Sequence, residues 1–127
     1  IAISAAIENF GLIDNCRTYG NAAYAGLVSV NRACGTLKNS YSSAFINNLN
    51  NNFTALPSAE VSGLVYNNYG LVEGCYFLGA AASGIASTNN STGTVRECYT
   101  MGTAYTAGLS NNNAGSVIGC YAVANLE

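Results

Sequence analysis

The chain is built on the stretch Gly70-Leu71-Val72-Glu73-Gly74-Cys75-Tyr76, which occurs in five related copies. The other four copies begin at Gly11, Gly35, Gly93 and Gly115. Each copy keeps a glycine, an aliphatic residue two positions later and a Cys or Ser five positions later. A motif that recurs in this way is typical of stacked units that cannot bury their apolar faces alone. The sequence therefore predicts a repeat architecture.

A second marker, a glycine followed by an aliphatic residue, precedes the four later copies at Gly26, Gly63, Gly84 and Gly108. The markers divide one domain, residues 1–127, into five coils: 1–25, 26–62, 63–83, 84–107 and 108–127. Four of the coils are close to 22 residues long, and the second carries an insertion. Short extended pieces alternate with Gly and Asn, and the chain has one Pro and no helical period. This pattern predicts an all-β fold, a parallel β-solenoid (β-helix) with three short strands in each coil.

The residues that replace one another within a column indicate which columns face the core. Two columns stay aliphatic and are expected to be buried: Ile13, Leu37, Val72, Val95 and Val117, and Leu27, Leu64, Ile85 and Leu109. The cysteine column holds Cys16, Ser40, Cys75, Cys98 and Cys120, and it is expected to contain buried free thiols. A fourth column holds Asn9, Asn31, Asn68, Asn89 and Asn113 at a corner, where stacked amides can hydrogen-bond along the stack.

Next to the first aliphatic column lies a charged column: Asp14, Lys38, Glu73, Arg96 and Ile118. The signs of its four charges alternate from coil to coil, which indicates an outward ladder that sets the register. Opposite charges across a ladder stabilise a sheet by about 0.2–1 kcal/mol per pair. Catalytic carboxylates at Asp14 and Glu73 are the weaker interpretation.

The tyrosine column is the strongest candidate for a binding surface. It follows the cysteine column and holds Arg17, Tyr41, Tyr76, Tyr99 and Tyr121. Because an Arg rarely replaces a buried Tyr, this column is expected to face solvent. Two residues further on, the same face carries Tyr19, Ser43, Leu78, Met101 and Val123. A contiguous apolar stripe on a surface usually marks a binding site. If the face were inverted, with Phe77 outside, the tyrosines would form core.

The insertion in the second coil is predicted to span residues 45–59. It is rich in Asn and holds the single proline, as a loop would, yet Phe45, Ile46 and Phe53 are too apolar for a free loop. These residues are therefore expected to contact the solenoid or a partner. Insertions in repeat proteins often carry the binding role.

The composition argues against several classes of function. Only 8% of the residues are charged and the net charge is -2, so no nucleic-acid footprint is present. No apolar run approaches the roughly 18 residues of a membrane span. The chain has no His and four basic residues, and its cysteines lack a zinc spacing. We therefore expect no enzyme activity, no metal and no cofactor; a polysaccharide-active β-helix enzyme is the least favoured alternative.

The third copy, Gly63-Leu-Val-Tyr-Asn-Asn-Tyr-Gly70-Leu-Val-Glu-Gly-Cys75-Tyr76-Phe-Leu-Gly79, resembles the GLUG motif of large bacterial surface proteins. That motif has the form G-L-V-x-x-N-x-G-x-I-x-N-C-Y-A-T-G. The resemblance covers nearly the whole chain, least well the first coil and the insertion. The chain departs from the motif with Ser40 for Cys and Arg17 for Tyr. The resemblance implies an exported, cell-surface or extracellular protein of adhesin type.

Both terminal coils look like interior repeats without a cap, and an uncapped ladder end is a template for further pairing. The expected partners are therefore copies of the chain stacked end to end into a filament, or the remainder of a longer solenoid. The tyrosine column offers a further surface for a host or cell-surface protein or a glycan. The overall expectation is a structural or adhesive extracellular β-solenoid.

Overall fold

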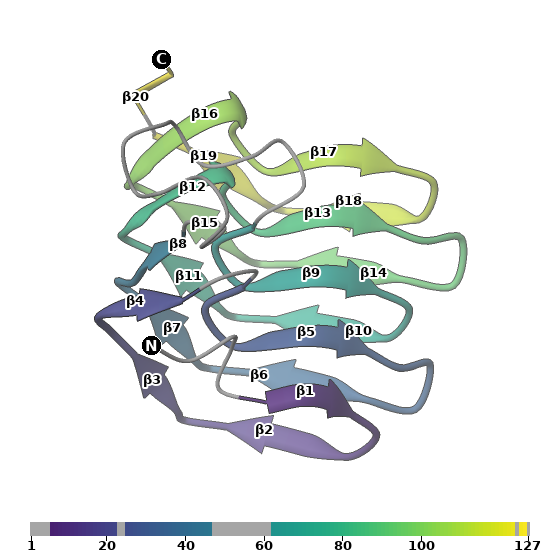
Figure 1. Cartoon of the computed structure of the whole chain (residues 1–127). Helices are drawn as coiled ribbons and strands as arrows, with labels where there is room; N and C mark the ends of the chain where they lie inside the picture. Colours follow the sequence, from purple (N-terminus) through teal and green to yellow (C-terminus); the bar gives the residue numbers. More distant parts are fainter. Residues whose placement is uncertain (1–5, 23–24, 47–61, 124, 127) are drawn as a thin grey trace.

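The computed structural model describes residues 6–22, 25–46, 62–123 and 125–126. In these ranges the strands form four parallel sheets of five strands each, and every coil contributes one strand to each sheet. Figure 1 shows the coils stacked from β1 and β2 at one end to β17 and β18 at the other. The structure confirms the predicted parallel β-solenoid.

The strands of each sheet follow in the order of the coils. Sheet 1 contains β1 (Ala6–Asn9), β5 (Val28–Asn31), β9 (Val65–Asn68), β13 (Ala86–Asn89) and β17 (Ser110–Asn113). Sheet 2 contains β2 (Leu12–Asp14), β6 (Thr36–Lys38), β10 (Leu71–Glu73), β14 (Thr94–Arg96) and β18 (Ser116–Ile118). Sheet 3 contains β3 (Arg17–Thr18), β7 (Tyr41–Ser42), β11 (Tyr76–Phe77), β15 (Tyr99–Thr100) and β19 (Tyr121–Ala122). Sheet 4 contains β4 (Asn21–Ala22), β8 (Phe45–Ile46), β12 (Ala80–Ser83), β16 (Thr103–Ala107) and β20 (Asn125–Leu126).

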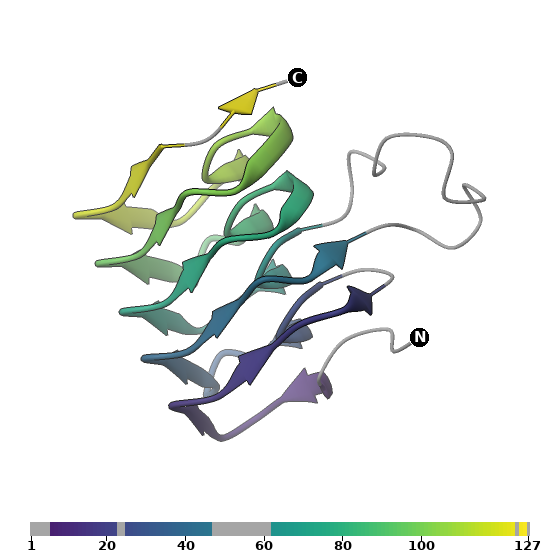
Figure 2. The same ribbon diagram turned by 90° about the vertical axis from the view of Figure 1, so that its left-hand side faces the viewer.

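The prediction of three strands per coil was wrong, because sheet 4 adds a fourth (Figure 2). Its strands include alanine-rich segments such as β12, Ala80–Ser83, which have weak β propensity and no alternating pattern. Strand formation there depends on the neighbouring coil, which supplies the backbone hydrogen bonds. The local sequence pattern therefore does not predict that these segments are strands.

Sheet 4 also corrects the start of the insertion. The predicted insertion begins at Phe45, but Phe45 and Ile46 form β8, which pairs with Asn21, Ala22 and Ala80. Their backbone therefore belongs to the solenoid. The remaining insertion, including Phe53, lies outside the described residues, and so do the side chains of Phe45 and Ile46.

A continuous apolar core runs along the solenoid axis. Leu27, Leu37, Leu64, Val72 and Phe77 are almost fully buried. Partly buried core residues pack against them in the outer coils: Ile13, Leu109, Val117 and Cys120. Both columns predicted to face the core are therefore buried or packed against the core.

The asparagine column forms a hydrogen-bonded ladder inside the corner between sheets 1 and 2. Each side-chain Nδ2 donates to the Oδ1 of the asparagine in the next coil, over 2.8–3.0 Å, from Asn9 through to Asn113. Each amide also bonds backbone groups; Asn68 donates to Gly70 O and accepts from Gly70 N. Since the inner asparagines are buried, these bonds satisfy groups that water cannot reach.

The corners that contain this ladder alternate in length. One residue separates Asn from Gly in the first, third and fifth coils, and three residues separate them in the second and fourth. The sequence records this alternation in the three residues between Asn31 and Gly35 and the single residue between Asn68 and Gly70. Long corners therefore always lie between short ones.

Arg32, in the long corner of the second coil, connects three successive coils. Its guanidinium carbon lies 5.9 Å from the ring centroids of both Phe10 and Tyr69, the central residues of the short corners on either side. Its Nε also donates to Glu8 over 2.6 Å. Such cation–π contacts contribute about 0.5–1 kcal/mol each at exposed sites.

The turn between sheets 2 and 3 requires a left-handed backbone in every coil. Asn15, Asn39, Gly74, Glu97 and Gly119 all have φ between 50° and 63° there. Gly accepts this conformation freely and Asn tolerates it, whereas a longer side chain is strained. Glu97 is therefore the strained member of the column.

Replacing Glu97 with asparagine is expected to raise the free energy of unfolding by about 1 kcal/mol, because strain in this region costs of order 1–3 kcal/mol. Urea unfolding followed by circular dichroism measures the change. The matched control is Asn39→Glu, which should lower the stability by a similar amount or more, since Asn39 also donates to Asp14 over 3.4 Å. A less stable Glu97→Asn variant would contradict the assignment of strain.

Candidate functional site

The candidate site is the outer surface of sheet 3, here called the tyrosine face. It consists of two rows: Arg17, Tyr41, Tyr76, Tyr99 and Tyr121, and Tyr19, Ser43, Leu78, Met101 and Val123. The backbone register places the first row on successive strands, with Tyr76 paired to both Tyr41 and Tyr99. The second row continues the same ladder; for example, Leu78 N donates to Ser42 O over 2.8 Å.

The alternation of each strand decides which way the tyrosines point. The residue after each tyrosine faces inward, and Ser42, Phe77 and Thr100 are almost fully buried. The tyrosines therefore lie on the outside, half-buried by their neighbours in the inner coils, and Tyr121 is 53% exposed. The inverted arrangement, with Phe77 outside, does not occur.

The four tyrosine rings form one parallel stack. Their centroids are 4.7, 4.9 and 5.1 Å apart from Tyr41 to Tyr121, and successive ring planes differ by 1–4°. Because the centroid spacing follows the ladder, each inner ring has a neighbouring ring against both of its faces. The ring edges and the phenol hydroxyls are therefore what this row offers to a partner.

Arg17 occupies the first position of the row. Its Nη1 donates to the hydroxyl of Tyr41 over 3.4 Å, and this hydrogen bond raises the pKa of the Arg17 guanidinium. Arg17 is exposed and lies on β3, the strand next to β7. The row therefore begins with a fixed positive charge and continues as an uncharged aromatic stack.

The second row makes the face apolar. Tyr19, Met101 and Val123 are 78%, 55% and 59% exposed, and Leu78 is 43% exposed. Ser43 interrupts them in the second coil. Large apolar side chains gathered on one sheet face are unusual on a protein that has no partner.

The tyrosine stack leads to a prediction about pH. Burial, followed by the neighbouring phenols of Tyr76 and Tyr121, raises the pKa of Tyr99 above its ordinary value of 10.0. A folded pKa above the unfolded value means that Tyr99 contributes stability below pH 10, and this contribution is lost as the pH rises through the folded pKa. Phenolate absorbance should therefore rise at higher pH in the folded protein than in urea.

The substitution Tyr99→Phe should bring the folded and urea titration curves closer together. An unchanged separation between the two curves would show that the shift has another origin. The same variant should unfold less readily than the original chain when the pH exceeds 10, because it lacks this titrating group.

The structure places the predicted register ladder on the outer surface of sheet 2. Asp14, Lys38, Glu73 and Arg96 are direct neighbours in the parallel pairing, and Ile118 follows Arg96. Arg96 Nε donates to Glu73 Oε2 over 2.7 Å. Among the described residues, Lys38 forms no ion pair within 4.0 Å, so it acts on its acidic neighbours from a greater distance. Asp14 and Glu73 are separated by the strand that carries Lys38, so the ladder does not bring them together as a pair.

The cysteines are all free. Cys75 and Cys98 are buried, whereas Cys16, also expected to be buried, is exposed. Cys16 adjoins β3, which in the described part of the chain has a neighbouring strand on one side only. Cys34, outside this column, is exposed as well.

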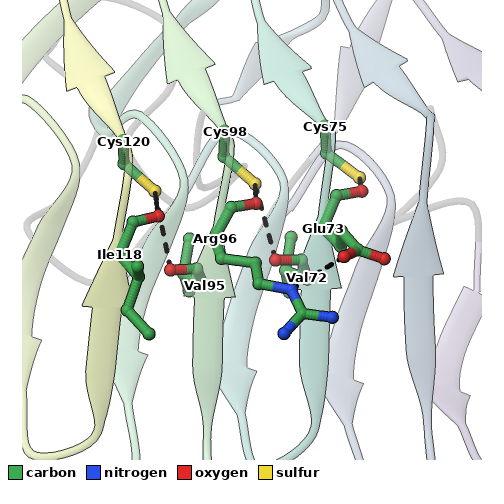
Figure 3. A network of polar contacts seen from close by, with 8 residues as sticks. All are labelled: Val72, Glu73, Cys75, Val95, Arg96, Cys98, Ile118 and Cys120. Atoms are coloured by element: carbon green, nitrogen blue, oxygen red, sulfur yellow. Dashed lines mark hydrogen bonds and ion pairs between the residues drawn. The ribbon is translucent and has the colours of Figure 1, made fainter.

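Three of the thiols close the left-handed turns (Figure 3). The thiols of Cys75, Cys98 and Cys120 donate to the carbonyl oxygen two residues earlier, over 3.2–3.4 Å, and Ser40 Oγ makes the same bond to Lys38 O over 2.8 Å. The neighbouring thiol of Cys75, followed by burial, raises the pKa of the Cys98 thiol. Burial also raises the pKa of the Cys120 thiol. Thiols held protonated in this way are poor nucleophiles.

A recess of about 290 Å³ lies on the outer surface of sheet 2, between the long corners of the second and fourth coils. Its lining includes Cys34, Thr36, Leu71, Thr92 and Arg96. The recess follows from the short corner of the third coil between two long ones. The Arg96 guanidinium at this site is already paired with Glu73.

The described residues contain neither a metal-binding cluster nor a membrane-spanning helix. No group of three or more His, Cys, Asp or Glu side chains in this part of the chain is placed to hold a metal ion. Within the same residues, no helix is long and apolar enough to cross a membrane.

Comparison with protein-family models, with curated proteins and with solved structures gave no match to this chain. The tyrosine face and the sheet edges are the features of this chain that bear on its function.

Proposed function

We propose that this chain is a non-enzymatic structural and adhesive β-solenoid of the cell surface or extracellular space, which binds a partner through its tyrosine face. The observation that carries the proposal is the row of exposed apolar side chains beside the stacked tyrosines. Exposed aromatic residues and Met are enriched at protein interfaces, and charged residues are depleted in the centre of such interfaces. The resemblance to the GLUG motif supports the cell-surface or extracellular location.

The geometry favours a protein partner with a flat apolar surface over a glycan. A sugar ring stacks on the open face of an aromatic ring, but Tyr76 and Tyr99 are covered by other tyrosines on both faces. A flat protein surface instead meets the ring edges, the phenol hydroxyls and the side chains of Leu78 and Met101. Glycan binding is the alternative that the experiment distinguishes.

The test is the adhesion of beads coated with the purified chain to surfaces that carry either extracellular-matrix protein or polysaccharide. The double variant Leu78→Ser/Met101→Ser should lose most of the adhesion to the protein surface. The control Leu12→Ser removes a side chain that is 63% exposed on sheet 2, outside the tyrosine face, and should adhere as the original chain does. Equal adhesion of both variants, or adhesion to polysaccharide alone, would contradict the proposal.

A second proposal is that copies of the chain stack end to end into a filament. In the described part of the chain, β1–β4 and β17–β20 are the edge strands of the four sheets. Edge strands present unpaired N–H and C=O groups to another chain. Negative-stain electron microscopy over a series of concentrations should show rods that lengthen with concentration. Particles of constant size would contradict filament formation and favour a place within a longer solenoid.

A further inference from the structure

The charged column of sheet 2 breaks its alternation at one position, Ile118. Signs alternate from Asp14 to Arg96, so an acidic residue would continue the pattern in the fifth coil. The residue there is instead Ile118, an apolar side chain that is 57% exposed beside Arg96. An acid at this position would pair well with Arg96 but would repel an acid on the far side. In a head-to-tail stack, the residue on the far side is Asp14 of the next copy.

The asparagine ladder has a direction that continues across such a junction. Every Nδ2 points toward the following coil, and every Oδ1 points toward the preceding one. Asn113 is exposed at one edge, and Asn9 begins the ladder at the other. Asn113 of one copy can therefore donate to Asn9 of the next, as the inner asparagines do.

Gly11 provides a third, independent observation. In the same column, a Cβ on Gly35, Gly70, Gly93 or Gly115 would lie under 3.0 Å from a carbonyl oxygen of the preceding coil. A Cβ on Gly11 meets no atom within 4 Å, and Gly11 has no positive φ. Nothing in the described structure of this chain therefore requires glycine at position 11. A coil stacked against Gly11 would require glycine there, because a Cβ would then meet a carbonyl oxygen of that coil.

The tyrosine row also fits a junction of this kind. The fifth and first coils both have short corners, so the alternation of corner lengths is interrupted at the junction, although no long corner meets another long corner. Arg17 of the next copy would follow Tyr121, whose ring has another tyrosine on one face only. A guanidinium over a free tyrosine face makes a favourable cation–π contact.

From these observations we propose that copies of this chain stack head to tail in a single register, with β17–β20 of one copy paired to β1–β4 of the next. This inference rests on the filament proposed above and names the residues that meet: Asn113 with Asn9, Ile118 with Asp14, and Tyr121 with Arg17. A head-to-tail contact of this kind generates an open filament instead of a closed dimer.

The first test is Gly11→Ala, assayed by sedimentation over a concentration series and by urea unfolding at low concentration. The added methyl group should leave the unfolding midpoint of the isolated chain unchanged. It should prevent assembly at concentrations where the original chain forms rods, because the Cβ would meet a carbonyl oxygen of the preceding copy. Rods formed equally well by Gly11→Ala would overturn the proposed register.

The second test changes the charge at the junction. Ile118→Asp keeps an attractive neighbour, Arg96, within its own chain but should raise the critical concentration up to about fivefold at low salt, through repulsion of Asp14 in the next copy. The neutral control Ile118→Asn should assemble as the original chain does, and Ile118→Asp/Asp14→Asn should regain assembly. In about 1 M salt, where charges are screened beyond about 3 Å, the difference should shrink.

The results of these tests distinguish the proposed register from the proposed filament. If the original chain remains monomeric at every concentration, both proposals fail. If it forms rods that neither Gly11→Ala nor Ile118→Asp affects, the filament stands and the register is wrong. Loss of assembly in Gly11→Ala, together with a critical concentration that Ile118→Asp raises and the double variant restores, supports the register.

Discussion

Replacing Gly70 with alanine is expected to lower the free energy of unfolding by at least about 3 kcal/mol. A Cβ at this position would lie under 3.0 Å from the carbonyl oxygens of Arg32 and Gly35, which belong to the backbone of the preceding coil. A backbone cannot rotate away as a flexible side chain can, so the two coils would have to separate. Separation would weaken the hydrogen bond from Leu71 N to Gly35 O, which is 3.0 Å long. Strain of this kind belongs to the most destabilising class of substitutions.

Gly11→Ala is the matched control for Gly70→Ala, since both glycines occupy the same column. At low concentration the control should change the stability by no more than about 0.5 kcal/mol, as is usual for surface positions. Urea unfolding followed by circular dichroism compares the two variants. If Gly70→Ala does not fold, Gly115→Ala repeats the test in an outer coil, which has more freedom to shift. Equal effects at positions 11, 70 and 115 would contradict the close approach of the coils.

Replacing Asn68 with alanine is expected to lower the free energy of unfolding by about 3 kcal/mol. The side chain lies in the middle of the ladder, where it accepts from Asn31 and donates to Asn89, each over 2.9 Å. Its removal leaves the Oδ1 of Asn89 and the N–H of Gly70 without these partners inside the corner. An unsatisfied buried polar group costs about 1–3 kcal/mol.

The control for Asn68→Ala is Asn113→Ala, at the exposed end of the same ladder. Water can replace the lost partner there, so the expected cost is about 1 kcal/mol or less. Thermal and urea unfolding of both variants measure the difference. A cost that is the same at the two positions would show that the ladder contributes through local turn geometry alone.

The repeat predicted the fold because its columns carry both kinds of information that a solenoid needs. The aliphatic column of Val72 identifies the core side, and the glycine column of Gly70 identifies where the coils approach closely. Their common spacing predicts parallel stacking in register. The outward direction of Tyr76 followed from the Arg at position 17, a substitution that a buried column does not tolerate.

Other features depend on contacts between coils, which a single copy of the repeat does not show. The strand Ala80–Ser83 has weak propensity and exists through its pairing with neighbouring coils. The strain at Glu97 was hidden because its column mixes Asn, Gly and Glu, and only the backbone angle unites them. The contact of Arg32 with Phe10 and Tyr69 requires residues from three coils. The covering of the ring faces depends on the tilt of the tyrosines, which no sequence column records.

The alternation of long and short corners gives the solenoid within one chain a period of two coils along one edge. Deleting or duplicating a single inner coil would bring two corners of the same length together, whereas doing so with two adjacent coils would preserve the phase. An engineer who lengthens the array should add an even number of coils, so that an arginine such as Arg32 keeps an aromatic residue on each side.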